Sequence, residues 1–207
     1  MLAAGGSTVA AEPAGGLTIV ALGDSLTAGY RLDQGDAFPA RLERALRDRG
    51  HEVTVVNGGV SGDTSSAVLS RLDWSVPEGA DAAIVEVGAN DALRGIDPDE
   101  TRRALSAIVR RLQDRGIEVL IAGMRAPPNM GGDYDRRFKA VFRDVAGETG
   151  ALLYPFFLDG VAADRALNLD DGMHPNARGV AVIVDRILPS VEELMSRVRE
   201  NRQAGRS

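Results

Sequence analysis

Residues 17–22 (LTIVAL) lead directly into residues 23–30 (GDSLTAGY), and this junction decides the architecture that the sequence predicts. The first run is short, nearly all apolar and partly β-branched, which is typical of a strand buried on both faces of a parallel sheet. The second run places the hydroxyl of Ser25 just past that strand, where ligand sites of such sheets lie. Taken alone, an Asp and a Ser beside a Gly are more often ordinary turn residues. The rest of the chain must therefore show whether Ser25 has a chemical role.

The alternation of buried strand and helix continues to the end of the chain. Apolar runs predict four more strands, at residues 53–56, 82–87, 117–123 and 151–154. Helices are expected over 38–49, from Asp63 or Thr64 to 72, and over 98–115, 134–148 and 177–188, with Asp36, Asp97 and Asn176 as caps and Pro189 breaking or kinking the last one. This order predicts an α/β fold, a three-layer α/β/α sandwich around a five-stranded parallel sheet with right-handed crossovers.

Length and composition are those of one ordinary globular domain. The chain has 207 residues, of which 44% are hydrophobic and 26% charged, and we assign the domain to residues 17–200. The net charge of -6 argues against a nucleic-acid partner, and the absence of Cys excludes disulfides and thiolate chemistry. No apolar run reaches the roughly 18 residues of a membrane span, so no stable membrane insertion is expected.

The two ends of the chain are expected to be disordered. Residues 1–16 are rich in Ala and Gly, contain no Lys or Arg and lack a continuous apolar core, so they are not an intact secretory signal. They are interpreted as a flexible arm or the remnant of a leader. Residues 201–207 are interpreted as a disordered tail.

Polar groups follow several of the predicted strands at their carboxyl ends. Gly62 lies in a glycine-rich turn after the second strand, and Asn90 follows the third. His174 has an acid, Asp171, shortly before it, and Pro175 keeps it in an extended segment. The other histidine, His51, is expected to be a solvated loop residue. Because the carboxyl ends of parallel strands share one edge, Ser25, Gly62, Asn90 and the His174 loop are expected to converge.

Convergence of these groups would supply the chemistry of acyl transfer. A serine hydroxyl needs a neighbouring base to take its proton, and an unperturbed imidazole titrates near pH 6.5, so His174 is the candidate base for Ser25. Asp171 would hold the imidazole tautomer. The backbone N–H groups of Ser25 and Gly62 and the side-chain amide of Asn90 would donate to the oxyanion. The residues thus indicate a serine hydrolase.

These motifs also resemble a known superfamily. GDSL at residues 23–26, Gly62 in SGDT, Asn90 in GAND and DGMHP at residues 171–175 are similar to the four ordered blocks of the SGNH, or GDSL, hydrolases, over about residues 17–188. GDSLTAGY, SGDT and the Pro-Pro-Asn loop resemble the bacterial thioesterase I, arylesterase and lysophospholipase branch. The resemblance implies a flavodoxin-like fold with Ser25 as nucleophile, Asp171 and His174 completing a triad, and no cofactor. It also implies hydrolysis of carboxylic esters and thioesters through an acyl-enzyme, and a periplasmic or secreted location, with a cytoplasmic one left open.

The loop at residues 124–133 is a candidate wall of the substrate pocket. It is rich in Pro and Gly and follows a strand, although an ordinary surface connection is an equally good interpretation. We include Asp24 and four residues of this loop as candidate substrate-binding residues: Pro127, Pro128, Asn129 and Met130. Phe156 and Phe157 favour an apolar acyl groove, but at least one of them is expected in the core.

One residue conflicts with its surroundings. Glu86 lies within the apolar third strand, and a buried carboxyl group needs hydrogen-bond partners or a raised pKa. A structural role close to the site is favoured over a catalytic one.

Three other functions compete with ester hydrolysis. A carbohydrate O-deacetylase of the same fold would need an open polar site. A non-catalytic lipid-binding or carbohydrate-binding domain would have no need of nucleophile, base and donors together. A metal-dependent phosphatase on Asp24, Asp63 and Asp91 is disfavoured because two histidines give a dinuclear site little ligand support, and no metal is expected.

Overall fold

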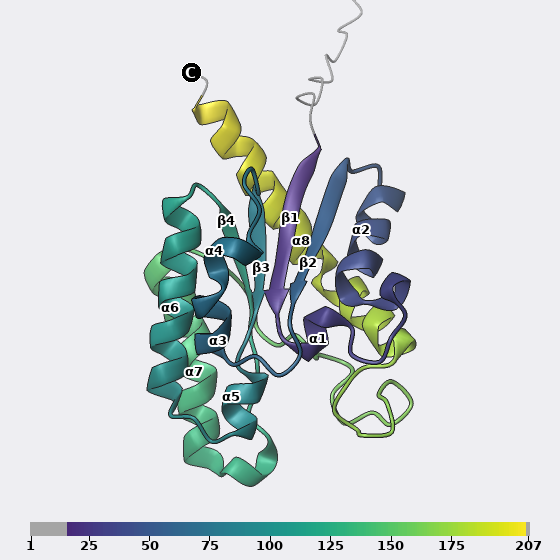
Figure 1. Ribbon diagram of the computed structural model, residues 1–207, viewed down its shortest axis with the longest axis vertical. Helices are drawn as coiled ribbons and strands as arrows, with labels where there is room; N and C mark the ends of the chain where they lie inside the picture. The colour runs from purple at the N-terminus through teal and green to yellow at the C-terminus, as the bar shows by residue number, and fades with distance from the viewer. Residues whose placement is uncertain (1–15, 206–207) are drawn as a thin grey trace, which may run out of the picture.

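The structure is a computed structural model that describes residues 16–205 (Figure 1). The expectation for residues 1–15 lies outside the described residues. The tail expected to be disordered from residue 201 begins instead as helix, because α8 (Ala177–Ala204) continues into it. No described helix is both long enough and apolar enough to span a membrane.

The centre of the molecule is one parallel sheet of five strands in the order β2-β1-β3-β4-β5. The strands are β1 (Leu17–Gly23), β2 (Val53–Gly59), β3 (Ala82–Glu86), β4 (Glu118–Ala122) and β5 (Leu152–Tyr154). This is the flavodoxin-like order, and it confirms the predicted fold class. β1 is paired on both sides, with Leu22 opposite Gly58 of β2 and Val85 of β3. Its apolar run is therefore buried on both faces, as its composition predicts.

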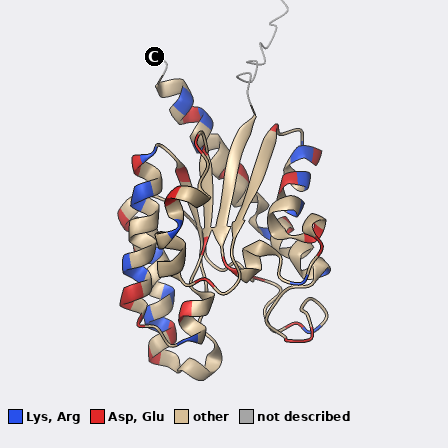
Figure 2. Ribbon diagram, in the orientation of Figure 1, with Lys and Arg blue, Asp and Glu red and all other residues tan. Residues whose placement is uncertain are grey.

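Helices cover both faces of the sheet (Figure 1). α2 (Phe38–Asp48) and α8 lie on one face, and α3 (Ser65–Ser70), α6 (Pro98–Asp114) and α7 (Gly132–Thr149) lie on the other. Short helices occupy the connections: α1 (Ser25–Ala28), η1 (Gln34–Asp36), α4 (Leu72–Ser75), α5 (Ala89–Leu93) and η2 (Pro128–Met130). Figure 2 shows Lys and Arg interleaved with Asp and Glu on the outer helices, so the basic residues form no continuous face there.

Helix capping agrees with the sequence at three helices and differs at one. Asp97 and Asn176 cap α6 and α8, and Thr64, one of two expected candidates, caps α3. Asp36 does not cap α2, because it ends η1 and its carboxylate binds Arg41 at 2.5 Å. Ala37 is the N-cap without a side-chain hydrogen bond, and the proline in the first turn removes one of the N–H donors that a cap would satisfy.

Most boundaries agree with the prediction to within two residues, including the start of α7 at Gly132, and the larger or more informative differences lie in β2, α3 and α8. β2 continues to Gly59 because its backbone stays in register with β1, and a Cβ at Gly59 would lie 2.3 Å from the Ala28 nitrogen. α3 ends at Ser70, before the short helix α4. α8 continues through Pro189, since its apolar stripe stays packed on the core to Val198. This packing outweighs a proline penalty of about 3 kcal/mol.

The aromatic residues near β5 divide between core and surface. Phe157 is fully buried and meets Phe38 edge-on, with ring centroids 5.0 Å apart. Phe156 is only partly buried, and the Arg125 guanidinium lies 4.5 Å from its ring centroid. Phe157 is therefore a core residue, as expected of at least one of the pair.

Candidate active site

The structure brings Ser25, His174 and Asp171 together at the carboxyl edge of the sheet, the lower edge in Figure 1. Ser25 is the first residue of α1, and Asp24 alone separates it from the end of β1. Its Oγ lies 2.9 Å from Nε2 of His174, and His174 Nδ1 lies 2.8 Å from Oδ2 of Asp171. These contacts join a hydroxyl, an imidazole and a carboxylate in series, which is the arrangement of a serine hydrolase triad.

Asp171 is fixed by the backbone of its own loop. Its Oδ1 accepts hydrogen bonds from the N–H groups of Met173 and His174, at 2.9 and 3.0 Å. The turn passes through Gly172 at φ +69°, a conformation that glycine adopts without strain. The backbone N–H of His174 is the main reason why the pKa of Asp171 falls to about 2, with that of Met173 next. Asp171 is thus a carboxylate throughout the pH range in which an imidazole acts as a base.

An aromatic ring packs against the imidazole. The rings of Tyr30 and His174 are tilted by 39°, with centroids 4.5 Å apart. The Arg31 guanidinium lies 5.2 Å from the centroid of the Tyr30 ring. Tyr30 ends the GDSLTAGY run, but nothing in its local sequence assigns it this contact with a residue so distant in the chain.

The three candidate oxyanion donors come from adjacent turns. Ser25 opens α1, so its N–H is one that the helix itself leaves without a partner. Gly62 adopts φ +89°, and its carbonyl accepts a hydrogen bond from Arg94 at 2.7 Å. The Asn90 amide donates to Oδ2 of Asp24 and to the carbonyl of Asp63, both at 3.0 Å. Asn90 therefore ties the turn of Ser25 to that of Gly62, and one of its hydrogens must turn away to reach an oxyanion.

Asp24, one of the candidate substrate-binding residues, has its hydrogen-bond partners within the protein. Its side chain is buried, and its Oδ1 accepts from the Leu26 N–H at 3.0 Å while its Oδ2 accepts from Asn90. Burial raises its pKa above the ordinary value, although these hydrogen bonds act in the opposite direction. Asp24 is the N-cap of α1, the helix that begins with Ser25, and a support for Asn90.

The loop with the four other candidate substrate-binding residues lies beside the Asn90 turn. Pro127 precedes η2, which contains Pro128, Asn129 and Met130. A Cβ at Gly95 would lie 3.6 Å from the Met130 methyl, and the Tyr134 hydroxyl donates to the Ile96 carbonyl at 2.7 Å. The loop thus borders the segment that follows the candidate oxyanion donor.

The carboxylates considered for a metal have other partners. Asp63 binds Arg71 at 2.6 Å, and Asp91 accepts hydrogen bonds from Ser65 and Thr101. They support the turns that carry Gly62 and Asn90.

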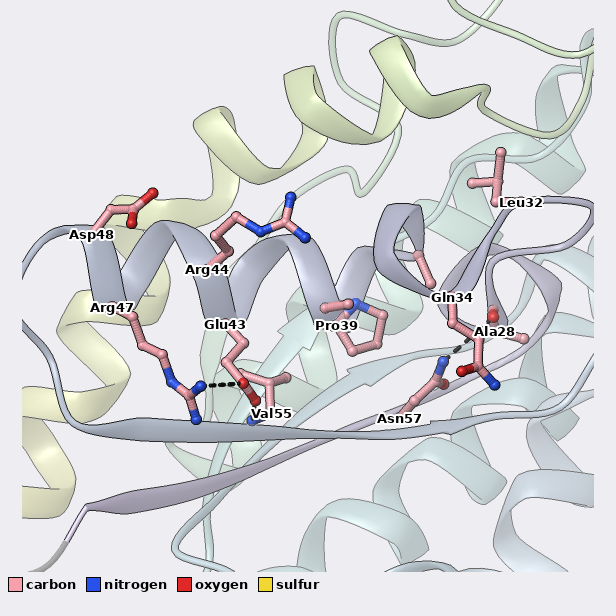
Figure 3. Close-up of a pocket in the computed structure, with 12 residues that line it drawn as sticks. Ala28, Leu32, Gln34, Pro39, Glu43, Arg44, Arg47, Asp48, Val55 and Asn57 are labelled. Carbon is pink, nitrogen blue, oxygen red and sulfur yellow. Dashed lines mark hydrogen bonds and ion pairs between the residues drawn. The ribbon is translucent and has the colours of Figure 1, made fainter.

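A separate groove of about 660 Å³ lies between α2 and the edge strand β2 (Figure 3). It contains none of the triad residues. Glu43 accepts from the Val55 N–H at 2.8 Å, and Arg47 donates to the Val53 carbonyl at 3.0 Å and pairs with Glu43. The side chains of α2 thus satisfy backbone groups of the edge strand that no neighbouring strand pairs, a protection against strand addition rather than a catalytic arrangement.

A Ser-His-Asp arrangement at the carboxyl edge of a flavodoxin-like sheet is typical of serine hydrolases. Residues 21–182 match the GDSL-like Lipase/Acylhydrolase family, and the chain belongs to this family. It is a carboxylic ester hydrolase.

Relatives cover most of the chain. Esterase TesA of Pseudomonas aeruginosa is 34% identical over 89% of this chain and 92% of its own length. Thioesterase 1/protease 1/lysophospholipase L1 of Escherichia coli K12 is 34% identical over 86% of this chain and 85% of its own. The crystal structure of AlinE4, an SGNH-hydrolase family esterase, is 45% identical, matches 88% of this chain and 98% of its own, and superposes with a TM-score of 0.74.

Proposed function

We propose that the protein hydrolyses carboxylic esters and thioesters through an acyl-enzyme on Ser25. The observation that carries the proposal is the unbroken series from Ser25 Oγ through the His174 ring to Asp171, with contacts of 2.9 and 2.8 Å. Ser25 and His174 are half-buried, so substrate can reach the hydroxyl. Relatives named esterase and thioesterase support the same chemistry.

Each turnover consists of two acyl transfers. Ser25 Oγ attacks the carbonyl carbon while its proton passes to His174 Nε2, and the bond to the leaving oxygen or sulfur then breaks as His174 returns the proton to the alcohol or thiol. Water next attacks the acyl-Ser25 ester and gives a proton to His174. The carboxylic acid leaves as Ser25 Oγ recovers that proton. Asp171 stabilises the imidazolium in both steps.

The tetrahedral intermediates need hydrogen-bond donors for their oxyanion. We assign these donors to the N–H groups of Ser25 and Gly62 and to the Asn90 amide. When the oxyanion forms, one Asn90 hydrogen leaves Asp24 or Asp63 for the new charge, and the other keeps the side chain in place. The interaction therefore strengthens in the transition state, which is where it accelerates the reaction.

Asn90→Ala is expected to lower kcat by about 10² or more with little change in KM, because the lost donor acts on the transition state. Steady-state kinetics on one p-nitrophenyl ester measures both constants. Asp91→Asn is the matched control. Asp91 is buried against Ser65 and Thr101, so this substitution should lower the melting temperature but reduce kcat much less than Asn90→Ala does. A rise in KM at constant kcat for Asn90→Ala would make Asn90 a substrate-binding residue instead.

The acyl group is proposed to be apolar. Three exposed apolar side chains lie within three positions of site residues in the chain: Val60 before Gly62, Leu93 after Asn90 and Met173 beside His174, exposed by 40, 55 and 51%. A panel of p-nitrophenyl esters, acyl-CoA, lysophospholipids and acetylated sugars tests this substrate class. Preference for acetylated sugars would instead support an O-deacetylase. We also infer a periplasmic or secreted location, which fractionation of the producing cells would test.

The loop at residues 126–133 is proposed to set the preference for acyl-chain length. It borders the Asn90 turn and carries apolar Pro127 and half-buried Met130. Shortening it is expected to change the ratio of short-chain to long-chain ester hydrolysis at least several-fold, since a pocket wall is lost. The ratio of kcat/KM for two p-nitrophenyl esters of different length measures this effect. Equal losses for both esters, together with a lower melting temperature, would show that the loop only maintains the fold.

A further inference from the structure

Glu86 is a fully buried carboxyl group at the end of β3, directly beneath the turn that carries Ser25. Its Oε2 accepts hydrogen bonds from the Thr27 hydroxyl at 2.9 Å and from the Asp24 N–H at 3.4 Å. These two donors lie on either side of Ser25 in the chain. One oxygen atom of a rigid central strand thus holds both flanks of the nucleophile.

The glycine before Asp24 leaves the space that this carboxyl group needs. A Cβ at Gly23 would lie 2.2 Å from the Thr27 hydroxyl and 2.6 Å from Glu86 Oε2. Any side chain at this position would therefore displace the hydrogen bond between Thr27 and Glu86. Gly23 and Glu86 are far apart in the sequence, but the Glu86 carboxyl group fits only because Gly23 has no side chain.

The surroundings of Glu86 favour its neutral form. Its Oε1 is buried and has no hydrogen-bond partner among the described residues. The charged group that acts on Glu86 is a second buried carboxyl, that of Asp24. A negative charge on Glu86 would therefore face another negative charge and no positive one. Burial is the main reason why the pKa of Glu86 lies well above its ordinary value, and the charge of Asp24 raises it further.

Asp24 connects Glu86 to the candidate oxyanion donor. Its backbone N–H donates to Glu86, and its own carboxylate accepts from Asn90 at 3.0 Å. A proton on Glu86 lets Asp24 remain the single anion of the pair, with the charge that orients the Asn90 amide.

We propose that Glu86 is a positioning residue, held as a neutral carboxylic acid, that fixes the Ser25 turn and, through Asp24, the Asn90 amide. This inference rests on the proposed roles of Ser25 and Asn90. Glu86 touches neither substrate nor reacting atoms, so it acts on the rate only through the geometry of these groups.

Two substitutions test whether Glu86 acts as a neutral carboxylic acid or as a buried negative charge. Glu86→Gln keeps a carbonyl oxygen as acceptor and replaces the acid's OH group with an NH₂ group, so it imitates the neutral acid. Glu86→Leu keeps the volume but removes every hydrogen bond. Glu43 is the matched control because it also accepts a backbone N–H, that of Val55, but in the groove between α2 and β2, which contains none of the triad residues, so Glu43→Leu should lower the melting temperature and leave kcat unchanged.

Glu86→Gln is expected to keep kcat within about threefold of wild type, whereas Glu86→Leu lowers kcat by about 10² with KM unchanged, the loss typical of a misplaced reacting group. Infrared spectra at neutral pH should contain the C=O band of a protonated carboxylic acid, and that band should be missing in Glu86→Gln. The Gln variant and the spectra decide the question even if Glu86→Leu does not fold.

Several results would overturn the inference. Wild-type kcat in Glu86→Leu would remove the positioning role. An equal loss in both Glu86 variants would show that a charge is required, and a carboxylic acid band that persists in Glu86→Gln would place the proton elsewhere. Failure of the proposed function is distinguishable, because wild-type protein would then not react with a fluorophosphonate at Ser25 whatever residue occupies position 86.

Discussion

Ser25→Ala is expected to reduce ester hydrolysis by several orders of magnitude, towards the roughly 10⁶ lost when the nucleophile of a serine protease is removed. The fold should survive, because among the described residues the Ser25 hydroxyl has His174 as its one hydrogen-bond partner, while the Ser25 backbone carbonyl accepts from Gly29 and Tyr30. The variant removes one oxygen and leaves these backbone bonds in place. Turnover of a p-nitrophenyl ester and the melting temperature, measured on the same preparation, test both parts.

A control and a chemical probe make this test specific. Ser70 also carries a hydroxyl on a helix, but it is exposed and donates to the Ser66 carbonyl, so Ser70→Ala should keep full activity. A fluorophosphonate should label wild type and Ser70→Ala but not Ser25→Ala. Retention of more than a few per cent of wild-type turnover in Ser25→Ala would refute the nucleophile, and no labelling of wild type would favour a non-catalytic binding domain.

The fold could be predicted from the sequence because its strands are short apolar runs separated by clear helix starts. Errors occurred where tertiary contacts outweigh local preference. Pro189 stays inside α8 because residues on both sides of it are buried in the core. β2 extends to Gly59 because Gly58 and Gly59 pair with β1, although these two glycines predict a turn from the local sequence.

The site could be predicted only as far as position along the chain determines it. Ser25, Asn90 and His174 follow strands or lie in edge loops, and a parallel sheet brings such segments together. The direction of a side chain is a different matter: the carboxylate of Asp24 is buried and accepts a hydrogen bond from Asn90. The contact between Tyr30 and His174 joins distant segments and leaves no local signal. Glu86 did leave a local signal, because a carboxyl group is unexpected inside an apolar strand.

Asp171→Asn is expected to cost about 10⁴ in kcat/KM, as the equivalent change does in a serine protease triad. The new side chain can keep its oxygen on the N–H groups of Met173 and His174, which hold Oδ1 of Asp171 in the wild type. Its NH₂ group then faces His174 Nδ1 in place of Oδ2. An amide donor there forces Nδ1 to accept, so the ring proton moves to Nε2 and blocks the nitrogen that must take the proton of Ser25.

Asp170→Asn is the matched control, because Asp170 is the exposed neighbour in the same loop and the Nδ1 contact of His174 belongs to Asp171. The loss of kcat/KM in Asp170→Asn should be small. The pKa of Asp171 is about 2, so Asp171 stays ionised above about pH 4 and its own titration does not limit wild-type activity there. We would measure kcat/KM for both variants on one p-nitrophenyl ester at several pH values. A larger loss for Asp170→Asn would reverse the assignment, and equal small losses would reduce the triad to a dyad of Ser25 and His174.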